Sequence, residues 1–325
     1  MKLPRRQFLY LAAGAAALPT ALRTAKAQDY PGRPVRIVVG FAAGGTQDIV
    51  VRLVGQSLSV RLGQQFIVEN RPGVNSSLSI EAVVRAPADG YILGVPGIAN
   101  VLNATLSDKL SFDLRRDLAM VAGLNVSPLV LEVHPALPVN SASDFVTYAK
   151  SRPGKVTIAS YGSGSISHVA AELFKAATGV STIHVPYRGS GPMLTDLLSG
   201  QVDAAFDNLP ASIEHIKANK LRALAITTTS RSAALPDVPS LSELLPQYEA
   251  SAFFGIGAPK NTPVAIIDRL NAAVNASLAD PRVAARLAQL GGAPLILSSG
   301  EFGKLIVDET DRWEKVIRAA NISHE

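Results

Sequence analysis

Residues 35–48, VRIVVGFAAGGTQD, decide the fold of this chain. Four of the first five residues are apolar and β-branched and predict a buried strand, and Gly40 to Gly45 interrupt it before a helical pattern begins near Gln47. Glycine at positions 44 and 45 allows backbone angles closed to other residues, so consecutive amide N–H groups can point at one spot ahead of the helix. A helix N-terminus adds partial positive charge there. The stretch therefore predicts an anion site, with a purely structural turn as the alternative.

The first 27 residues form a predicted export signal. A basic start precedes an apolar segment over residues 8–22, and residues 25–27, AKA, provide a small-x-small cleavage pattern. Residues 4–9, PRRQFL, resemble a twin-arginine signal, with the general secretory route as the alternative. The segment is too short and too rich in alanine for a good membrane span. We therefore expect a periplasmic protein.

Removing this leader changes the charge of the chain. The leader holds five basic residues and no acid, so 26 basic residues remain against 26 acidic ones. A formally neutral protein gives no electrostatic reason to bind nucleic acid. The chain has no cysteine and therefore no disulfide, and its 47% apolar content is enough for two lobes built around a core.

Strands and helices alternate along the rest of the chain. The pattern predicts strands at 35–39, 65–69, 91–95, 130–133, 156–160, 181–185, 202–207, 221–227 and 253–258. It predicts helices between most of them, among them 47–62, 78–85, 142–151, 167–178, 192–199 and 210–218. This order favours an α/β fold with parallel sheets and a ligand crevice at the carboxyl ends of the strands. We expect residues 28–128 and 250–325 to form one lobe and residues 129–249 the other.

Three further segments follow strand ends and are expected at the crevice. They are residues 96–100, residues 161–167 (YGSGSIS) and the pair Asp207-Asn208. A carboxylate in a crevice needs a donor, so Asp207 is expected to meet the ligand, with a helix cap as the alternative. His168 is balanced between capping its helix and contacting the ligand.

Signatures of catalysis are weak. The chain contains no G-x-S-x-G, and the loop at 161–167 has Ser167 where a dinucleotide fingerprint needs its third glycine. The five histidines lack metal-ligand spacing. We expect a binding protein with no catalytic residues, no metal and no cofactor.

Several motifs occur in an order that resembles a known family. They are GFxxGGxxD at 40–48, ENRPG at 69–73, PxDGY at 87–91, GxGSxxH at 162–168, HVPYRG at 184–189, FDN at 206–208 and LPDVP at 235–239. The set resembles the Bug family, the extracytoplasmic solute receptors of tripartite tricarboxylate transporters. The resemblance implies a type II periplasmic-binding-protein fold: two Rossmann-like α/β lobes, two crossover strands and a ligand cleft between the lobes. It also implies a monomer that binds a small carboxylate and delivers it to membrane subunits.

The candidate ligand contacts follow from the crevice loops and from this resemblance. They are Phe41, Ala43, Gly44, Gly45, Thr46, Asp48, Asn100, Ser163, Gly164, Ser165, His168 and Asp207. The chain departs from the family at Ala42 and Ala43, where prolines are usual, and at 95–100, where hydroxyls are fewer. An envelope sensor that signals to a kinase, or an enzyme on the same scaffold, are the alternative functions.

Overall fold

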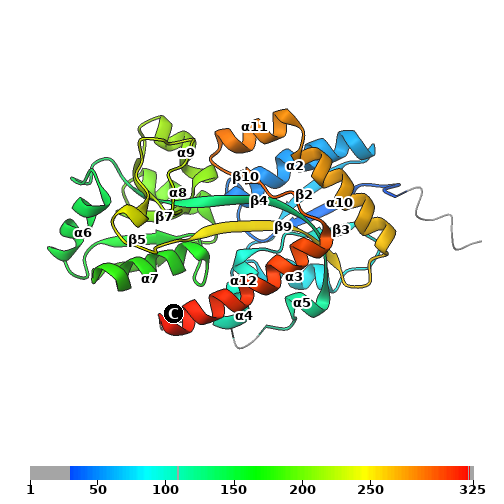
Figure 1. Cartoon of the computed structure of the whole chain (residues 1–325), viewed down its shortest axis with the longest axis horizontal. Coiled ribbons are helices and arrows are strands. Elements are labelled where there is room, and N and C mark those ends of the chain that lie inside the picture. Colours follow the sequence, from blue (N-terminus) through cyan, green and yellow to red (C-terminus); the bar gives the residue numbers. More distant parts are fainter. Residues whose placement is uncertain (1–29, 108–109, 321, 323–325) are drawn as a thin grey trace, which may run out of the picture.

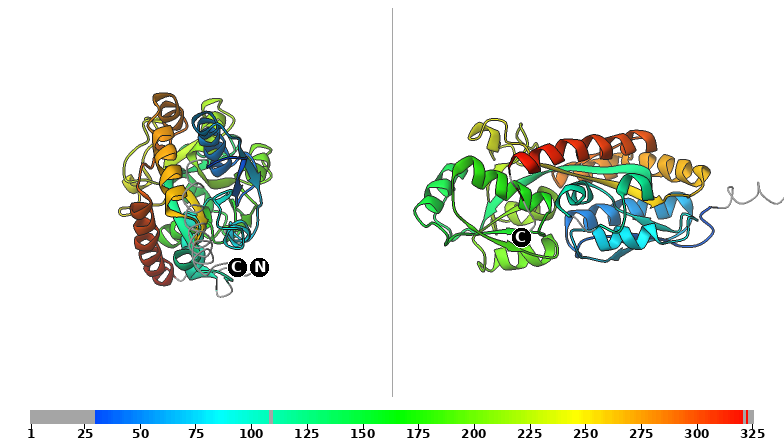
Figure 2. Two further views of the ribbon diagram at one scale, coloured as in Figure 1. Left: turned by 90° about the vertical axis from the view of Figure 1, so that its right-hand side faces the viewer. Right: turned by 90° about the horizontal axis from the view of Figure 1, so that it is seen from below.

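A computed structural model describes residues 30–107, 110–320 and 322 of the chain. The predicted export signal lies outside these residues. The described chain forms two α/β lobes joined side by side, and two long strands, β4 (Leu118–Val133) and β9 (Ser251–Pro259), run through both (Figure 1). Seen from below, the N-terminal elements and the central elements form two separate bodies (Figure 2).

The elements of the first lobe come from both ends of the chain. They are β1 (Val35–Val39), α2 (Thr46–Leu62), β2 (Phe66–Asn70), α3 (Ser77–Val84), β3 (Ile92–Gly94), α4 (Ile98–Leu106), α5 (Leu114–Asp117), α10 (Val264–Leu278), α11 (Pro281–Gln289), β10 (Ala293–Pro294) and α12 (Ser299–Ala319). The second lobe is continuous. It contains α6 (Ala142–Lys150), β5 (Thr157–Ser160), α7 (Ile166–Thr178), β6 (Ile183–Pro186), α8 (Ser190–Leu198), β7 (Ala204–Asn208), α9 (Leu209–Lys217), β8 (Arg222–Ile226) and a 3-10 turn at Leu241–Glu243.

The sheet is parallel within each lobe and antiparallel where the lobes join. In the first lobe β1 pairs in parallel with β2 and β3, and in the second β5 pairs in parallel with β6 and β7. Antiparallel pairing of β4 with β9 connects the two halves in the order β2-β1-β3-β9-β4-β7-β5-β6. This architecture confirms the predicted two-lobe fold with two crossover strands.

Two predicted segments were wrong. Strand β4 begins at Leu118, twelve residues before the predicted start, because its glycine, asparagine and proline obscure the strand pattern and only pairing with β9 makes it regular. The loop expected at residues 96–100 is cut short, because residues 98–100 already belong to helix α4. The division at residues 128 and 129 falls inside β4, so the exact lobe boundaries stay a prediction.

The helices of the described chain lie on both faces of the sheet and bury one side each (Figures 1 and 2). In α12 a capping box fixes the start, because Ser298 Oγ accepts from the Glu301 amide and the Glu301 carboxylate accepts from the Ser298 amide. No helix in the described ranges is long and apolar enough to cross a membrane.

Candidate functional site

A small cavity lies between the lobes, next to the crossing strands. It is lined by Phe41, Gly45, Thr46, Gln47, Ile98 and Ala99 from the first lobe, by Tyr161, Ser190 and Asn208 from the second, and by Ala252, Phe253 and Phe254 of β9. Its volume is about 20 Å³, enough for one or two water molecules. A larger occupant would have to hold the lobes farther apart than they are here.

The lobes touch each other around this cavity. The amide of Ala42 donates to the carbonyl of Arg188 over 3.2 Å, and Asn75 Nδ2 donates to the carbonyl of Gly164 over 2.8 Å. The rings of Phe41 and Tyr161 meet edge to face across the cleft with centroids 5.6 Å apart. The structure is therefore a closed form of a two-lobe protein.

Four helices begin at the cavity wall, and none of their N-cap residues caps its helix with a side chain. The N-caps are Gly45 for α2, Gly97 for α4, Gly189 for α8 and Asn208 for α9. The first amides of a helix have no partner within the helix, and the helix dipole adds partial positive charge to them. Together the four N-termini create an environment that favours a negative charge.

Several helices that start elsewhere are capped by a side chain, although α3 and α10 are not. Ser141, Ser165, Asp280 and Ser298 each accept from an amide in the first turn of α6, α7, α11 and α12. Side-chain caps of this kind stabilise a helix by about 1 kcal/mol. Their absence at the cavity leaves donors available for an occupant.

Buried polar atoms at the cavity also lack partners. Thr46 Oγ1, Gln47 Oε1 and Asn208 Oδ1 make no hydrogen bond within the described chain, although each side chain is more than nine-tenths buried. Leaving such a group unsatisfied costs about 1–3 kcal/mol. A polar ligand, or water in its absence, would satisfy all three atoms at one place.

The loop before α2 has the predicted support. Asp48 accepts from the Gly44 amide over 3.1 Å and pairs with Arg52 over 2.8 Å. Burial acts to raise the pKa of Asp48, but the hydrogen bonds from Arg52 and the Gly44 amide outweigh it and hold the pKa below its ordinary value. Ala43 and Gly44 are exposed at the mouth, while Phe41, Gly45 and Thr46 line the cavity.

The second glycine loop lies beside this cavity, with its polar groups bonded to each other. Ser165 caps α7 by accepting from the His168 amide, and His168 Nδ1 accepts from the Gly164 amide. The ring of His168 stacks on His184 with centroids 4.0 Å apart. Ser163 lines a separate space between the lobes, on the other side of Phe41 and Tyr161. Of this predicted loop, only Tyr161 reaches the cavity wall.

Asn100 has a structural position as well. Its Oδ1 accepts from the Gly97 amide over 3.2 Å at the start of α4. The side chain is buried and lines a different hollow near α5, so it does not reach the cavity between the lobes.

Asp207 lies one layer behind the cavity wall. It is fully buried, with Oδ1 accepting from Ser190 Oγ over 2.5 Å and from the Asn208 amide over 2.8 Å, and Oδ2 accepting from Ser212 Oγ over 3.0 Å. Burial raises the pKa of Asp207 to about 7, although these three donors act to lower it. The alternative role, a cap for α9, is not seen either: Asn208 and not Asp207 stands at the N-cap position, and its side chain makes no capping hydrogen bond.

A second carboxyl group, which the sequence analysis missed, lies beside Asp207. Glu132 on β4 is fully buried, and its Oε1 is 2.7 Å from Ser212 Oγ. Burial, together with the charge of Asp207, raises the pKa of Glu132 well above its ordinary value. In the sequence, the feature that points to this buried group is an acidic residue inside the apolar run LVLEV at 129–133.

Several wall residues were also missed. They are Gln47, Ser190 and residues 252–254, whereas Ile98, Ala99, Tyr161 and Asn208 lie in segments that were expected at the crevice but were not named as ligand contacts. The sequence next to Ser190 does contain a feature that could have identified it. Glycine at 189 leaves α8 without a side-chain cap, just as glycine at 45 does for α2. In the described residues no three His, Cys, Asp or Glu side chains gather to hold a metal.

Comparisons with known proteins identify relatives over most of the chain. The family model for the tripartite tricarboxylate transporter family receptor matches residues 50–322. Protein BugT of Bordetella pertussis is 37% identical over 295 residues, covering 90% of each chain. A UPF0065 protein from the tcbD-tcbE intergenic region of a Pseudomonas species is 35% identical, covering 94% of this chain and 92% of its own.

Solved structures show the same fold. The structure of Rpa4515 from R. palustris with adipate has a TM-score of 0.88 and 36% identity, covering 91% of this chain and 99% of that one. MatC from Rhodopseudomonas palustris with bound malate has a TM-score of 0.84 and 32% identity, covering 89% and 100%.

Proposed function

Because the chain belongs to the tripartite tricarboxylate transporter receptor family, we propose that it captures a small carboxylate between its lobes and delivers it to the membrane subunits of such a transporter. It would act in the periplasm, as a monomer and without catalysis. The predicted signal at residues 1–27 would direct its export, by the twin-arginine route that residues 4–9 resemble.

The observation that carries this proposal is the convergence of four uncapped helices on one enclosed cavity. A carboxylate has two oxygens that accept several N–H bonds, and it gains most from the free amides and dipoles of α2 and α4 in the first-lobe wall. The unpartnered oxygen atoms of Thr46 and Gln47 lie in the same wall and can bond a water that bridges to the ligand. Phe41, Ile98 and Phe253 supply apolar enclosure for the carbon skeleton.

The two related structures with adipate and malate support the ligand class, because both molecules are small dicarboxylates. Micromolar capture needs about 8 kcal/mol, which a few amide bonds, bridging water and apolar enclosure can provide. Since the closed cavity is small, the ligand would enter an open form and the lobes would close on it as far as its size allows.

Isothermal titration of the purified protein tests the proposal. The panel contains succinate, malate, adipate, citrate, aspartate and glutamate, with the uncharged amide succinamide as a matched control. At least one carboxylate should bind with a dissociation constant in the micromolar range, and succinamide should not bind. A panel that gives neither heat nor a thermal shift would contradict the proposed function.

A further inference from the structure

The buried acids Glu132 and Asp207 share a proton through Ser212. Ser212 Oγ lies 2.7 Å from Glu132 Oε1 and 3.0 Å from Asp207 Oδ2. A hydroxyl has one proton and can donate to only one of these oxygens. The other short contact needs a proton on a carboxyl group, so above about pH 7, where Asp207 is ionised, the pair holds one carboxyl proton and one negative charge.

The charge belongs on Asp207. Three donors surround it: the hydroxyls of Ser190 and Ser212 and the amide of Asn208. Glu132 has no such shell, because its Oε2 has no partner within the described chain. A neutral Glu132 that donates to Ser212, which in turn donates to Asp207, satisfies both short contacts.

This charge fixes the orientation of the Ser190 hydroxyl. The 2.5 Å distance from Ser190 Oγ to Asp207 Oδ1 is typical of a hydroxyl that donates to a carboxylate. Since its only proton points at Asp207, Ser190 presents lone pairs to the cavity that it lines. Ser190 is therefore a fixed acceptor at the wall.

Asn208 adds a second acceptor beside it. Its Nδ2 donates to the hydroxyl of Tyr161 over 3.2 Å, which leaves Oδ1 unpartnered at the cavity. Tyr161 stays neutral, because burial and then the charge of Asp207 raise its pKa. The second lobe therefore offers acceptors where its wall meets an occupant.

The first-lobe wall, in contrast, presents hydrogen-bond donors to the cavity. Helices α2 and α4 have no proline in their first turn, so their amides are N–H donors. In the second lobe Pro192 and Pro210 stand within the first turns of α8 and α9 and lack an N–H. A carboxylate suits the first wall, and a group that donates hydrogen bonds suits the second.

We propose that the Glu132–Ser212–Asp207 chain makes Ser190 a specificity-determining acceptor, which selects carboxylates that also carry a hydroxyl or ammonium group. This inference rests on the proposed function and narrows its ligand class. A ligand that lacks the donor would leave Ser190 and Asn208 without partners, and sites built to bond a donor discriminate strongly against its absence.

Matched ligands test the inference on the unsubstituted protein. Titrations at about pH 8 compare succinate with both enantiomers of malate and of aspartate, which differ from it by one hydroxyl or ammonium group. At least one of the four should bind about tenfold more tightly than succinate. If succinate or adipate binds as tightly as all four, the inference is wrong while the proposed function stands. If no acid in the panel binds, both fail.

Ser190→Ala tests the residue itself. It should reduce the preference for the hydroxy or amino acid over succinate to less than about threefold. Thr195→Ala removes an exposed hydroxyl from the same helix and should keep the full preference. A Ser190→Ala protein that binds succinate and retains the full preference would overturn the assignment.

Discussion

Glu132 and Asp207 link the stability of the protein to pH. A carboxyl group whose pKa is higher in the folded than in the unfolded chain binds more protons when folded. The pKa of Asp207 rises from 3.8 to about 7 on folding, and that of Glu132 rises well above its ordinary value, in both cases chiefly through burial. Their contribution to stability is therefore fully present below the unfolded pKa values and is lost as pH rises toward the folded ones.

We expect the free energy of unfolding to fall between pH 5 and pH 7. Each of the two carboxyl groups contributes a slope of about 1.4 kcal/mol per pH unit in this window. Glu132→Gln keeps the shape and the donor to Ser212 but cannot ionise, so it should remove about half of the slope. Urea unfolding at four pH values measures this.

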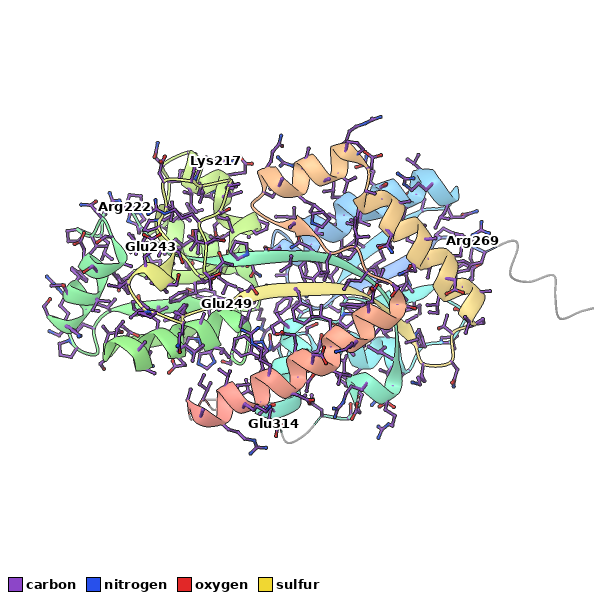
Figure 3. All side chains as sticks on the ribbon, in the orientation of Figure 1. Lys217, Arg222, Glu243, Glu249, Arg269 and Glu314 are labelled. Carbon is purple, nitrogen blue, oxygen red and sulfur yellow. The ribbon has the colours of Figure 1, made fainter. Side chains whose placement is uncertain are left out.

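Glu314→Gln is the matched control, because Glu314 lies on the surface of α12 and pairs with the exposed Arg318 (Figure 3). It should leave the slope unchanged. Equal slopes in the original protein and Glu132→Gln would mean that Glu132 is not protonated in the folded state.

The sequence predicted that Asp207 must meet donors, but it could not identify them. Those donors are Ser190, Ser212 and the Asn208 amide, which belong to the protein itself. Glu132 lies 80 residues from Ser212 along the chain, and only the antiparallel pairing of β4 with β7 brings them together. The residues next to Glu132 in the sequence give no information about this long-range pairing.

Among the helices, capping distinguishes the starts of α2 and α7, although α3 and α10 are uncapped without lying in the cavity wall. Both glycine loops follow a strand and precede a helix, so the sequence analysis treated them alike. In the structure Ser165 caps α7, whereas Gly45 leaves α2 uncapped. The predicted loop before α2 does form part of the first-lobe wall of the cavity. In the second lobe the wall comes mainly from the starts of α8 and α9, and not from the predicted loop before α7.

Gly45→Asp should give a more stable protein that no longer binds carboxylates. Gly45 has φ −82° and ψ 168°, which suit any residue, and an added Cβ would meet only ordinary contacts of 3.6 Å or more. An aspartate there would cap α2 and place a negative charge at its N-terminus, stabilising by about 0.5–1 kcal/mol. The same carboxylate would occupy the amides that a ligand needs. Thermal unfolding and titration with the tightest carboxylate measure the two effects.

Ser298→Ala provides the reverse control. It removes the side-chain cap of α12, so it should lower the free energy of unfolding by about 1 kcal/mol and leave binding intact. Full binding by Gly45→Asp would show that the amides of α2 take no part in capture.

Across the whole molecule, one apolar core continues through both lobes. The same cluster of buried side chains includes Ile80 and Trp313 in the first lobe, and Leu131 and Phe206 in the second. Strand β4 passes through it and pairs with strands of both lobes. We therefore expect the lobes to unfold together.

Leu131→Ala tests this cooperativity. Leu131 is fully buried at the second-lobe end of β4, and its truncation should cost about 2–5 kcal/mol. Trp313, the one tryptophan of the chain, reports on α12 in the first lobe. Its fluorescence should show the same lowered denaturation midpoint as circular dichroism.

Val60→Ala, at a side chain 84% exposed on α2, should change neither midpoint. An unshifted Trp313 transition in Leu131→Ala would show that the lobes unfold independently.

The position of β9 in the sheet has a consequence for biosynthesis. Strand β9 lies between β3 and β4, yet it is made more than a hundred residues after both. Until the ribosome delivers it, these two neighbours have free backbone edges, and such edges invite pairing with other chains. We therefore expect translation products that end before β9 to aggregate more readily than the complete chain.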